Sequence, residues 1–206
     1  MKIRSILLTL PILIFGLTAC RQQTTDGSVA AERETVPPLS ENEQTEFLEK
    51  GKTIAGATFT ALSSRLQAAM QEGGVANAIG YCQLNAYPLV DSLSEVHGAT
   101  IRRTTLKVRN PKDAPDELER SILEQYAAQD EAGEKLGPMV QAVAGQEVVF
   151  FAPIRTNAFC LQCHGTPGQT LQEEDLSLIR EHYPEDQAIG YQDGDLRGMW
   201  SIRLKR

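Results

Sequence analysis

The sequence is poor in the side chains that build metal and nucleophilic sites: its 206 residues include 4 cysteines, 3 histidines and 1 tryptophan. It also lacks a net positive charge, since 27 acidic residues outnumber 20 basic ones. Nucleic-acid-binding proteins present clustered positive charge to phosphates, so this balance argues against nucleic acid as a partner. No internal repeat is found, and no apolar run reaches the roughly 20 residues that cross a bilayer.

The first twenty residues have the pattern of an export signal. Lys2 and Arg4 precede a short apolar run, residues 6–17, which is followed by Thr18-Ala19-Cys20. Small residues before a cysteine resemble a bacterial lipobox, in which Cys20 is lipidated and becomes the mature N-terminus. Cleavage there leaves 18 basic and 27 acidic residues and a net charge of −9. A negative protein is not drawn to an anionic membrane surface, so the acyl chains would hold it there.

These signals divide the chain into three segments. We predict a lipoprotein signal peptide over residues 1–19, a lipidated cysteine with a flexible tether over 20–39, and one folded domain over 40–206. The predicted location is the exported side of a bacterial membrane, facing the periplasm. Arg21 is not the aspartate that commonly retains lipoproteins at the inner membrane, which slightly favours the outer membrane.

The strongest chemical signal is the stretch Cys160-Leu161-Gln162-Cys163-His164. This is the attachment signature of a c-type haem, in which each thiol adds to a vinyl group and the imidazole binds the iron. The two thiols are about one helical turn apart, so both sulfurs can face the same porphyrin edge. With so few cysteines and histidines, chance places this pattern in roughly one such sequence in a thousand. We predict one covalent haem c, with His164 as an iron ligand.

Two other interpretations of this stretch stay open at this point. A thioredoxin-like Cys-X-X-Cys motif needs no adjoining histidine and favours a βαβ context, which the sequence does not show. A zinc site would combine Cys160, Cys163 and His164 with Cys82, although zinc sites usually take their ligands from better separated pairs. The export signal favours haem independently, because covalent haem attachment takes place on the exported side of membranes.

Four helices are predicted from apolar positions that recur every three or four residues and from their caps: 40–70, 75–97, 116–132 and 172–182. Ser40 and Glu43 form a capping box, and Gly73-Gly74 breaks the first helix from the second. The second helix buries a face that includes Cys82. Pro88 should kink or divide this helix.

Four strands are predicted from alternating apolar residues: 99–106, 139–144, 147–154 and 196–204. Residues 148–151 are apolar on both faces, which places that strand in the middle of the sheet. Asp193-Gly194 is a hairpin signal that would join residues 189–191 to the last strand. Long helices followed by antiparallel strands with inserted helices predict an α+β domain, and a sheet curled around one cofactor would have this order.

Several stretches outside the haem motif are distinctive in their order: residues 78–82 (Ala-Ile-Gly-Tyr-Cys), 101–104 (Ile-Arg-Arg-Thr), 109–111 (Arg-Asn-Pro), 116–119 (Asp-Glu-Leu-Glu), 190–191 (Gly-Tyr) and 194–198 (Gly-Asp-Leu-Arg-Gly). Together with the haem motif, over about residues 43–204, they resemble a family of exported c-type monohaem proteins with a PAS-like fold, long listed as a domain of unknown function. The Arg-Asn-Pro segment and the upstream cysteine are more specific than the haem motif, which many unrelated cytochromes share.

The resemblance implies that the iron is bound by His164 on one side and by the thiolate of Cys82 on the other. From the helical pattern alone, Cys82 would be an ordinary small buried side chain. The other candidates for the sixth ligand have more ordinary roles at a helix end, on the surface or in apolar packing: His97, His182, Met139 and Met199.

Other side chains are expected around the haem. Arg102, Arg103 and Arg109 are candidates for the haem propionates, because guanidinium groups bind carboxylates in a bidentate fork. Tyr81 and Phe159 adjoin the predicted ligand Cys82 and the thiol pair, and we expect them to line the pocket.

The predicted function is a membrane-tethered, exported haem protein that acts as a redox-responsive sensor or a low-potential electron-transfer module, and not as an enzyme. A thiolate ligand stabilises ferric iron and lowers the reduction potential. The alternative is a haem peroxidase or gas-binding sensor with an open sixth position; the peroxidase would need a distal acid/base from His97 or His182. Expected partners are an unidentified redox or signalling protein, and a second copy of the chain through its first helix.

Overall fold

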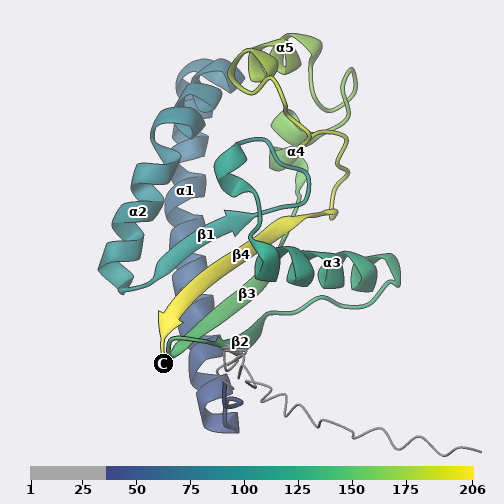
Figure 1. Cartoon of the computed structure of the whole chain (residues 1–206). Coiled ribbons are helices and arrows are strands. Elements are labelled where there is room, and N and C mark those ends of the chain that lie inside the picture. The colour runs from purple at the N-terminus through teal and green to yellow at the C-terminus, as the bar shows by residue number, and fades with distance from the viewer. Residues whose placement is uncertain (1–35) are drawn as a thin grey trace, which may run out of the picture. The chain divides into compact units, whose positions relative to one another are not determined.

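Residues 36–206 are described by the structure, which is a computed structural model; the predicted signal peptide, Cys20 and most of the tether lie outside the described residues. The elements follow the chain as α1 (Glu41–Leu84), α2 (Ala86–His97), β1 (Thr100–Thr104), the 3-10 helix η1 (Pro111–Asp113), α3 (Glu117–Glu131), β2 (Met139–Val143), β3 (Glu147–Arg155), α4 (Ala158–His164), α5 (Glu173–His182) and β4 (Leu196–Lys205). The strands form an antiparallel sheet in the order β1-β4-β3-β2 (Figure 1). The predicted α+β class is confirmed.

The sheet separates two apolar cores. α1 and α2 cover one face with a cluster that includes Ile54, Leu62, Val90, Phe150 and Trp200. α3 covers the other face with a cluster that includes Ile122, Tyr126, Val149, Phe151 and Met199. β3 contributes to both cores because successive side chains of a strand point to opposite faces. Its central place between β2 and β4 confirms the prediction made from its two apolar faces.

Close packing of α1 against β3 depends on Gly51. A Cβ atom at this position would lie 2.2 Å from Cγ of Phe150, which has no exposed surface. Only a residue without a side chain allows the helix to approach the strand this closely. The first part of α1 is therefore fixed firmly on the sheet.

α1 is interrupted at the two glycines that the sequence marked. Gly73 (φ −159°, ψ 26°) and Gly74 (φ 64°, ψ −157°) have non-helical backbones. The conformation of Gly74 is essentially available to glycine alone. Across the break, the Asn77 side-chain amide donates to the carbonyl of Ala69 at 3.0 Å. The predicted break is confirmed, and it separates the sheet-bound part of α1 from the part that carries Cys82.

The predicted second helix is divided, as Pro88 indicated. α2 starts at Ala86, so Pro88 is its third residue, where a backbone amide has no acceptor inside the helix. The left-handed C-cap at Gly98 (φ 57°) ends α2. At the start of α1, both hydrogen bonds of the predicted Ser40–Glu43 capping box are present.

One sequence expectation is wrong. No strand forms at residues 189–191, so the Asp193-Gly194 turn does not join a hairpin to β4. The amides of Gly190 and Tyr191 instead donate to the carbonyls of Gly165 and His164, at 2.9 and 3.0 Å. The end of α4 supplies the acceptors that a neighbouring strand would have supplied.

Candidate functional site

The predicted iron ligands and attachment thiols lie on two helices, the second part of α1 and α4, and the irregular segment 183–195 packs against α4 (Figure 1). Ile79 of α1 and Cys163 of α4 share an apolar cluster with Leu176 and Ile179 of α5. The segment 183–195 holds the opposite side of α4. The motif is therefore anchored by elements that are distant in the sequence.

Asn157 starts α4 and arranges its first turn. Its side-chain oxygen accepts hydrogen bonds from the amides of Phe159 and Cys160, at 3.0 and 3.2 Å. The same oxygen accepts from the thiol of Cys160, whose Sγ lies 3.3 Å away. Asparagine is a preferred N-cap residue because it satisfies these otherwise unpaired amides. The cap thus sets both the start of the helix and the direction of one thiol.

His164, the last residue of α4, is held in one orientation. Its Nδ1 lies 2.7 Å from the carbonyl oxygen of Ala188, and the Tyr191 ring packs edge-on with centroids 6.4 Å apart. Burial and the nearby charges of Arg197, Arg109 and Arg103 hold the pKa of His164 well below its usual value. The imidazole is therefore neutral, with its Nδ1 hydrogen on the carbonyl and Nε2 available as an electron-pair donor.

The segment 183–195 is fixed to α4 by Arg109. Its guanidinium binds Asp186 through Nε and Nη2, at 3.1 and 2.9 Å, and the side chains are only 12% and 2% exposed. Nη2 also donates to the carbonyls of Cys163 and Ala188, at 2.7 and 3.3 Å. One arginine thus positions both the end of α4 and the carbonyl that holds His164.

Cys82 lies near the end of α1 on the side of α4. Burial raises the pKa of its thiol, while the charges of Arg103 and Arg109 act in the opposite direction. Burial also raises the pKa of Cys163 to about 11, and a further contribution comes from Cys82. The two thiols are thus close enough to interact electrostatically, and both are neutral at pH 7. All three cysteines of the described residues are free thiols.

The three arginines chosen from the sequence have different surroundings. Arg102 points to the α3 face, where Nε lies 3.2 Å from the fully buried carboxylate of Glu119. Arg103 points to the opposite face of the sheet, because successive side chains of a strand alternate between the two faces. Arg109 has Asp186 as its carboxylate partner. Of these three arginines, only Arg103 has no carboxylate partner within residues 36–206.

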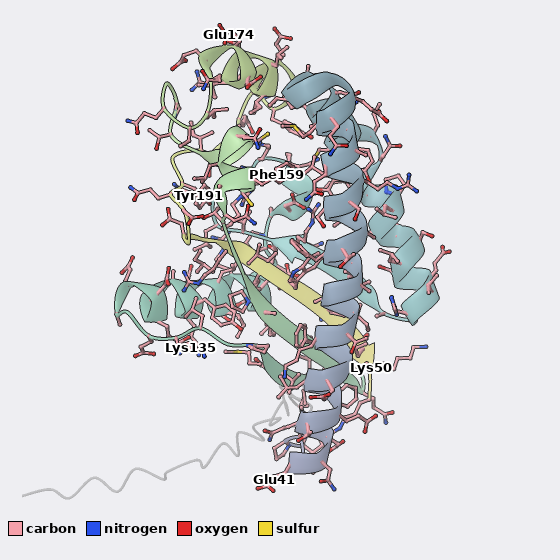
Figure 2. The ribbon with its side chains drawn as sticks, turned by 180° about the vertical axis from the view of Figure 1, so that it is seen from behind. Glu41, Lys50, Lys135, Phe159, Glu174 and Tyr191 are labelled. Carbon is pink, nitrogen blue, oxygen red and sulfur yellow. The ribbon has the colours of Figure 1, made fainter. Side chains whose placement is uncertain are left out.

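Tyr81 and Phe159 adjoin the thiols as expected from their sequence positions, and both are partly exposed. Burial raises the pKa of Tyr81, with a further contribution from the neighbouring Cys82. In Figure 2, Phe159 lies on the side of α4 toward α1, and Tyr191 lies on the other side. Their place in a pocket stays a prediction.

The remaining sulfur and imidazole candidates have the ordinary roles expected of them. Met199 is fully buried in the α3 core, and Met139 packs against the same cluster. His182 is exposed on α5, and His97 is the last residue of α2. In residues 36–206 no three His, Cys, Asp or Glu side chains gather into a metal-binding group, so the zinc ligand set is not assembled.

The sequence matches one family model over residues 30–205, the Tll0287-like model. The chain belongs to the Tll0287-like family. The crystal structure of the cyanobacterial haem protein Tll0287 is 26% identical, with 74% of this chain and 94% of that chain covered and a TM-score of 0.49. A comparison with curated proteins found no match. The family expected from the motif order is confirmed.

Sequence reasoning missed several residues that shape the site of this Tll0287-like chain. Asp186 and Ala188 lie in a segment without a periodic pattern, and nothing local marks them as partners of Arg109 and His164. Arg197 is the second residue of β4, and its guanidinium lies 5.4 Å from the Tyr191 ring centroid. The only available signal for Arg197 was its place within the distinctive stretch at residues 194–198.

Proposed function

We propose that this Tll0287-like protein binds one haem c through Cys160 and Cys163, with His164 and Cys82 as the two iron ligands. The fixed ring of His164 carries the proposal, since Nδ1 is held 2.7 Å from the Ala188 carbonyl directly after the thiol pair. Iron-binding histidines usually give their other N–H to a carbonyl or carboxylate, which fixes the tautomer and leaves Nε2 for the metal. Membership of the family supports the coarser part of the proposal, haem binding.

The residues present fit the group. Cys160 and Cys163 are one turn apart in a single helix, and both are free thiols. Each would add its sulfur and its hydrogen across one vinyl double bond, which forms a C–S and a C–H bond and needs no oxidant. Cys82 is a third free thiol within electrostatic range of Cys163. The dithiol interpretation leaves the carbonyl-held imidazole unexplained, and no zinc ligand set comes together within residues 36–206.

We propose a redox-responsive sensor or low-potential electron-transfer module, and not a catalyst. Bound haem supplies a one-electron iron couple. The chain's own residues hold the ligands: Arg109 and Asp186 fix the segment that orients His164, while Leu161 and Tyr191 cover the imidazole side of α4. A peroxidase would need a distal acid/base. Neither free histidine is well placed for this role. His97 is the last residue of α2, about 16 Å from the start of that helix, which follows Cys82 in the chain, and His182 is exposed.

The location and partners are part of the same proposal. A lipid on Cys20 would hold the protein to the exported side of a bacterial membrane, the outer membrane being favoured. Within residues 36–206 no helix is long and apolar enough to span a bilayer. A redox or signalling protein is the proposed partner. A homodimer through α1 stays a prediction, for which the exposed Phe59 on that helix is the residue to mutate.

The ligands are tested by the optical and paramagnetic-resonance spectra of the ferric protein, produced with a c-haem maturation system. A low-spin spectrum with thiolate character is expected, and Cys82→Ala should abolish that character. Leu84→Ala is the matched control, because Leu84 is 69% exposed on the same helix. An unchanged Cys82→Ala spectrum contradicts the ligand assignment. A high-spin wild-type spectrum favours the peroxidase or gas-binding alternative.

Covalent attachment is tested separately on denaturing gels stained for haem. The wild-type band should stain, and the Cys160→Ala/Cys163→Ala double variant should not. The Cys82→Ala variant should still stain, because the proposed role of Cys82 is ligation and not attachment. A wild-type band without stain rejects the haem proposal and returns the dithiol and zinc interpretations.

A further inference from the structure

Three guanidinium groups lie around the site. Arg109 donates to the Ala188 carbonyl that holds the His164 ring, and Arg197 lies over the Tyr191 ring that packs against His164. Arg103 lies in the neighbouring strand β1, which pairs with β4. Such a concentration of positive charge in a partly buried region is unfavourable unless negative charge balances it. The carboxylates of the described residues balance only part of it. The question is therefore which of the three guanidinium groups is left for an anion.

Arg109 shows how this protein satisfies a buried arginine. Its Nε and Nη2 form a bidentate pair with the two oxygens of Asp186, at 3.1 and 2.9 Å. This edge of the guanidinium matches the spacing of a carboxylate, which makes the paired geometry the strong one. Because Asp186 and the carbonyls of Cys163 and Ala188 take the hydrogens of Nε and Nη2, Arg109 has no bidentate edge left for another carboxylate.

Arg197 presents the same edge without a carboxylate. Its Nη1 donates to the hydroxyl of Thr105 at 2.9 Å and to the carbonyl of Lys107 at 3.4 Å. Its Nε is buried and has no acceptor, and Nη2 makes no hydrogen bond to residues 36–206. A buried N–H without an acceptor is rare in folded proteins and destabilising. The free Nε/Nη2 edge therefore indicates that an acceptor is missing.

Arg103 is the second arginine without a counter-charge. It faces the α1 side of the sheet, opposite Trp200 of β4, and it has no hydrogen bond or ion pair within residues 36–206. The same face of the sheet is covered by α1, the helix that carries the proposed iron ligand Cys82.

The other basic residues nearby are excluded by their positions. Arg102 is on the opposite face of the sheet, paired with Glu119. Lys107 is exposed, donates to the carbonyl of Ile189 at 3.3 Å, and lies over the Tyr191 ring. Arg65 is exposed on the first part of α1. Arg197 and Arg103 are left as the partly buried guanidinium groups without a carboxylate, and haem carries two propionate carboxylates.

We infer that Arg197 and Arg103 each bind one propionate of the haem, with Arg197 using its free Nε/Nη2 edge. This inference rests on the proposed haem function and replaces the earlier set of three candidate arginines with a specific pair. Arg102 and Arg109 are structural residues under this assignment. The two arginines balance the propionate charges and fix the orientation of the macrocycle, whose attachment depends on the cysteines alone.

The test compares Arg197→Gln and Arg103→Gln with the control Arg120→Gln, which removes the same charge from an exposed position on α3. The propionate bending modes in the resonance Raman spectrum should shift in each of the first two variants and stay unchanged in the control. The reduction potential should fall in the same two variants, because a nearby cation favours the reduced iron. Covalent haem content should be retained.

Arg197→Lys separates charge from geometry and serves if Arg197→Gln does not fold. It keeps the positive charge but lacks the fork. The propionate modes should still shift, while the potential stays closer to that of the wild type. Haem-loaded variants with wild-type Raman modes and potential overturn the inference and leave the haem proposal intact. A wild-type chain that carries no haem contradicts the haem proposal itself. The two failures are distinguished by whether the wild type and the Arg120→Gln control bind haem.

Discussion

Two regions of this protein are held together by different interactions. The sheet region, with the first part of α1, α2 and α3, is built around fully buried apolar side chains such as Phe150, Phe151 and Ile202. The site region, with the second part of α1, α4, α5 and residues 183–195, depends on backbone acceptors, on the buried Arg109–Asp186 pair and on small apolar clusters. The sheet region is packed mainly through apolar contacts, whereas the surroundings of His164 include two guanidinium groups, those of Arg103 and Arg197, whose charge an added group can balance.

This difference explains where a cofactor fits. An apolar core is already close-packed and leaves no room for a cofactor. The site region contains a carbonyl-held imidazole and three thiols, and two guanidinium groups without carboxylates adjoin it from β1 and β4. Haem would satisfy these groups together, so its binding should stabilise the site region more than the sheet region.

The largest effect is expected from Phe150→Ala in the sheet region. Phe150 has no exposed surface and packs against Gly51 of α1. Removing its ring leaves a cavity and should lower the free energy of unfolding by about 3–5 kcal/mol. Urea unfolding followed by circular dichroism measures this. The loss should be the same with and without haem, and a loss confined to the haem-free protein would contradict the separation of the two regions.

Arg109→Ala is the corresponding change in the site region. It leaves the carboxylate of Asp186, only 2% exposed, buried without its partner. We expect a loss of about 3 kcal/mol, since breaking a buried ion pair strands the remaining charge. Hydrogen exchange should become faster for the amides of α4 and residues 186–191, and not for those of β3.

Arg203→Ala is the control for Arg109→Ala. Its pair with Asp116 is at the surface, with side chains 27% and 47% exposed. Exposed pairs contribute little, so the expected loss is at most about 1 kcal/mol. Equal losses in the two variants would show that the Arg109–Asp186 pair does not hold the site region together.

The junction between the regions is tested by Gly74→Ala. Gly74 has a φ of 64° and a ψ of −157°, so a Cβ atom there would strain the backbone by about 1–3 kcal/mol. The change should also displace Cys82 and alter the haem spectrum. Gly56→Ala is the matched control, because Gly56 is helical and a Cβ there meets nothing within 4 Å. It should stabilise α1 by about 0.5–1 kcal/mol and leave the spectrum unchanged.

The smallest effect concerns the far end of the sheet region, where Arg206 binds Glu43. Hydrogen bonds from Arg206 and Ser40 lower the pKa of Glu43 from 4.5 to about 2. A lowered folded-state pKa adds stability that is fully present above pH 4.5 and lost as the pH falls through about 2. Glu43→Gln should remove this part of the acid dependence. A Glu43 pKa near 4.5 in an NMR titration would show that the contact does not persist in solution.

Local sequence signals predicted most of the sheet region. The Ser40–Glu43 box, the Gly73-Gly74 break and the two apolar faces of β3 depend on residues near one another in the chain, and each is confirmed. The opposite directions of Arg102 and Arg103 were also implied by strand alternation. Naming both as candidates for the haem propionates overlooked that they point to opposite faces of the sheet.

The site region was predicted only in part, because its partners are far apart in sequence. Asp186 is 77 residues from Arg109, and Ala188 is 24 residues from His164. No periodic pattern connects such positions. The hairpin expected at Asp193-Gly194 failed for the same reason, since α4 competes for the amides that a strand would have used.

The position of β4 also has a consequence for how the chain is made. β4 lies between β1 and β3, yet it is the last of the four strands in the sequence. Residues 196–205 must therefore be in place before the sheet can close, and until then β1 and β3 expose unpaired edges. Such long-range pairing slows folding and keeps the chain open for longer. Under the proposed covalent attachment, this delay would leave Cys160 and Cys163 accessible while haem is added.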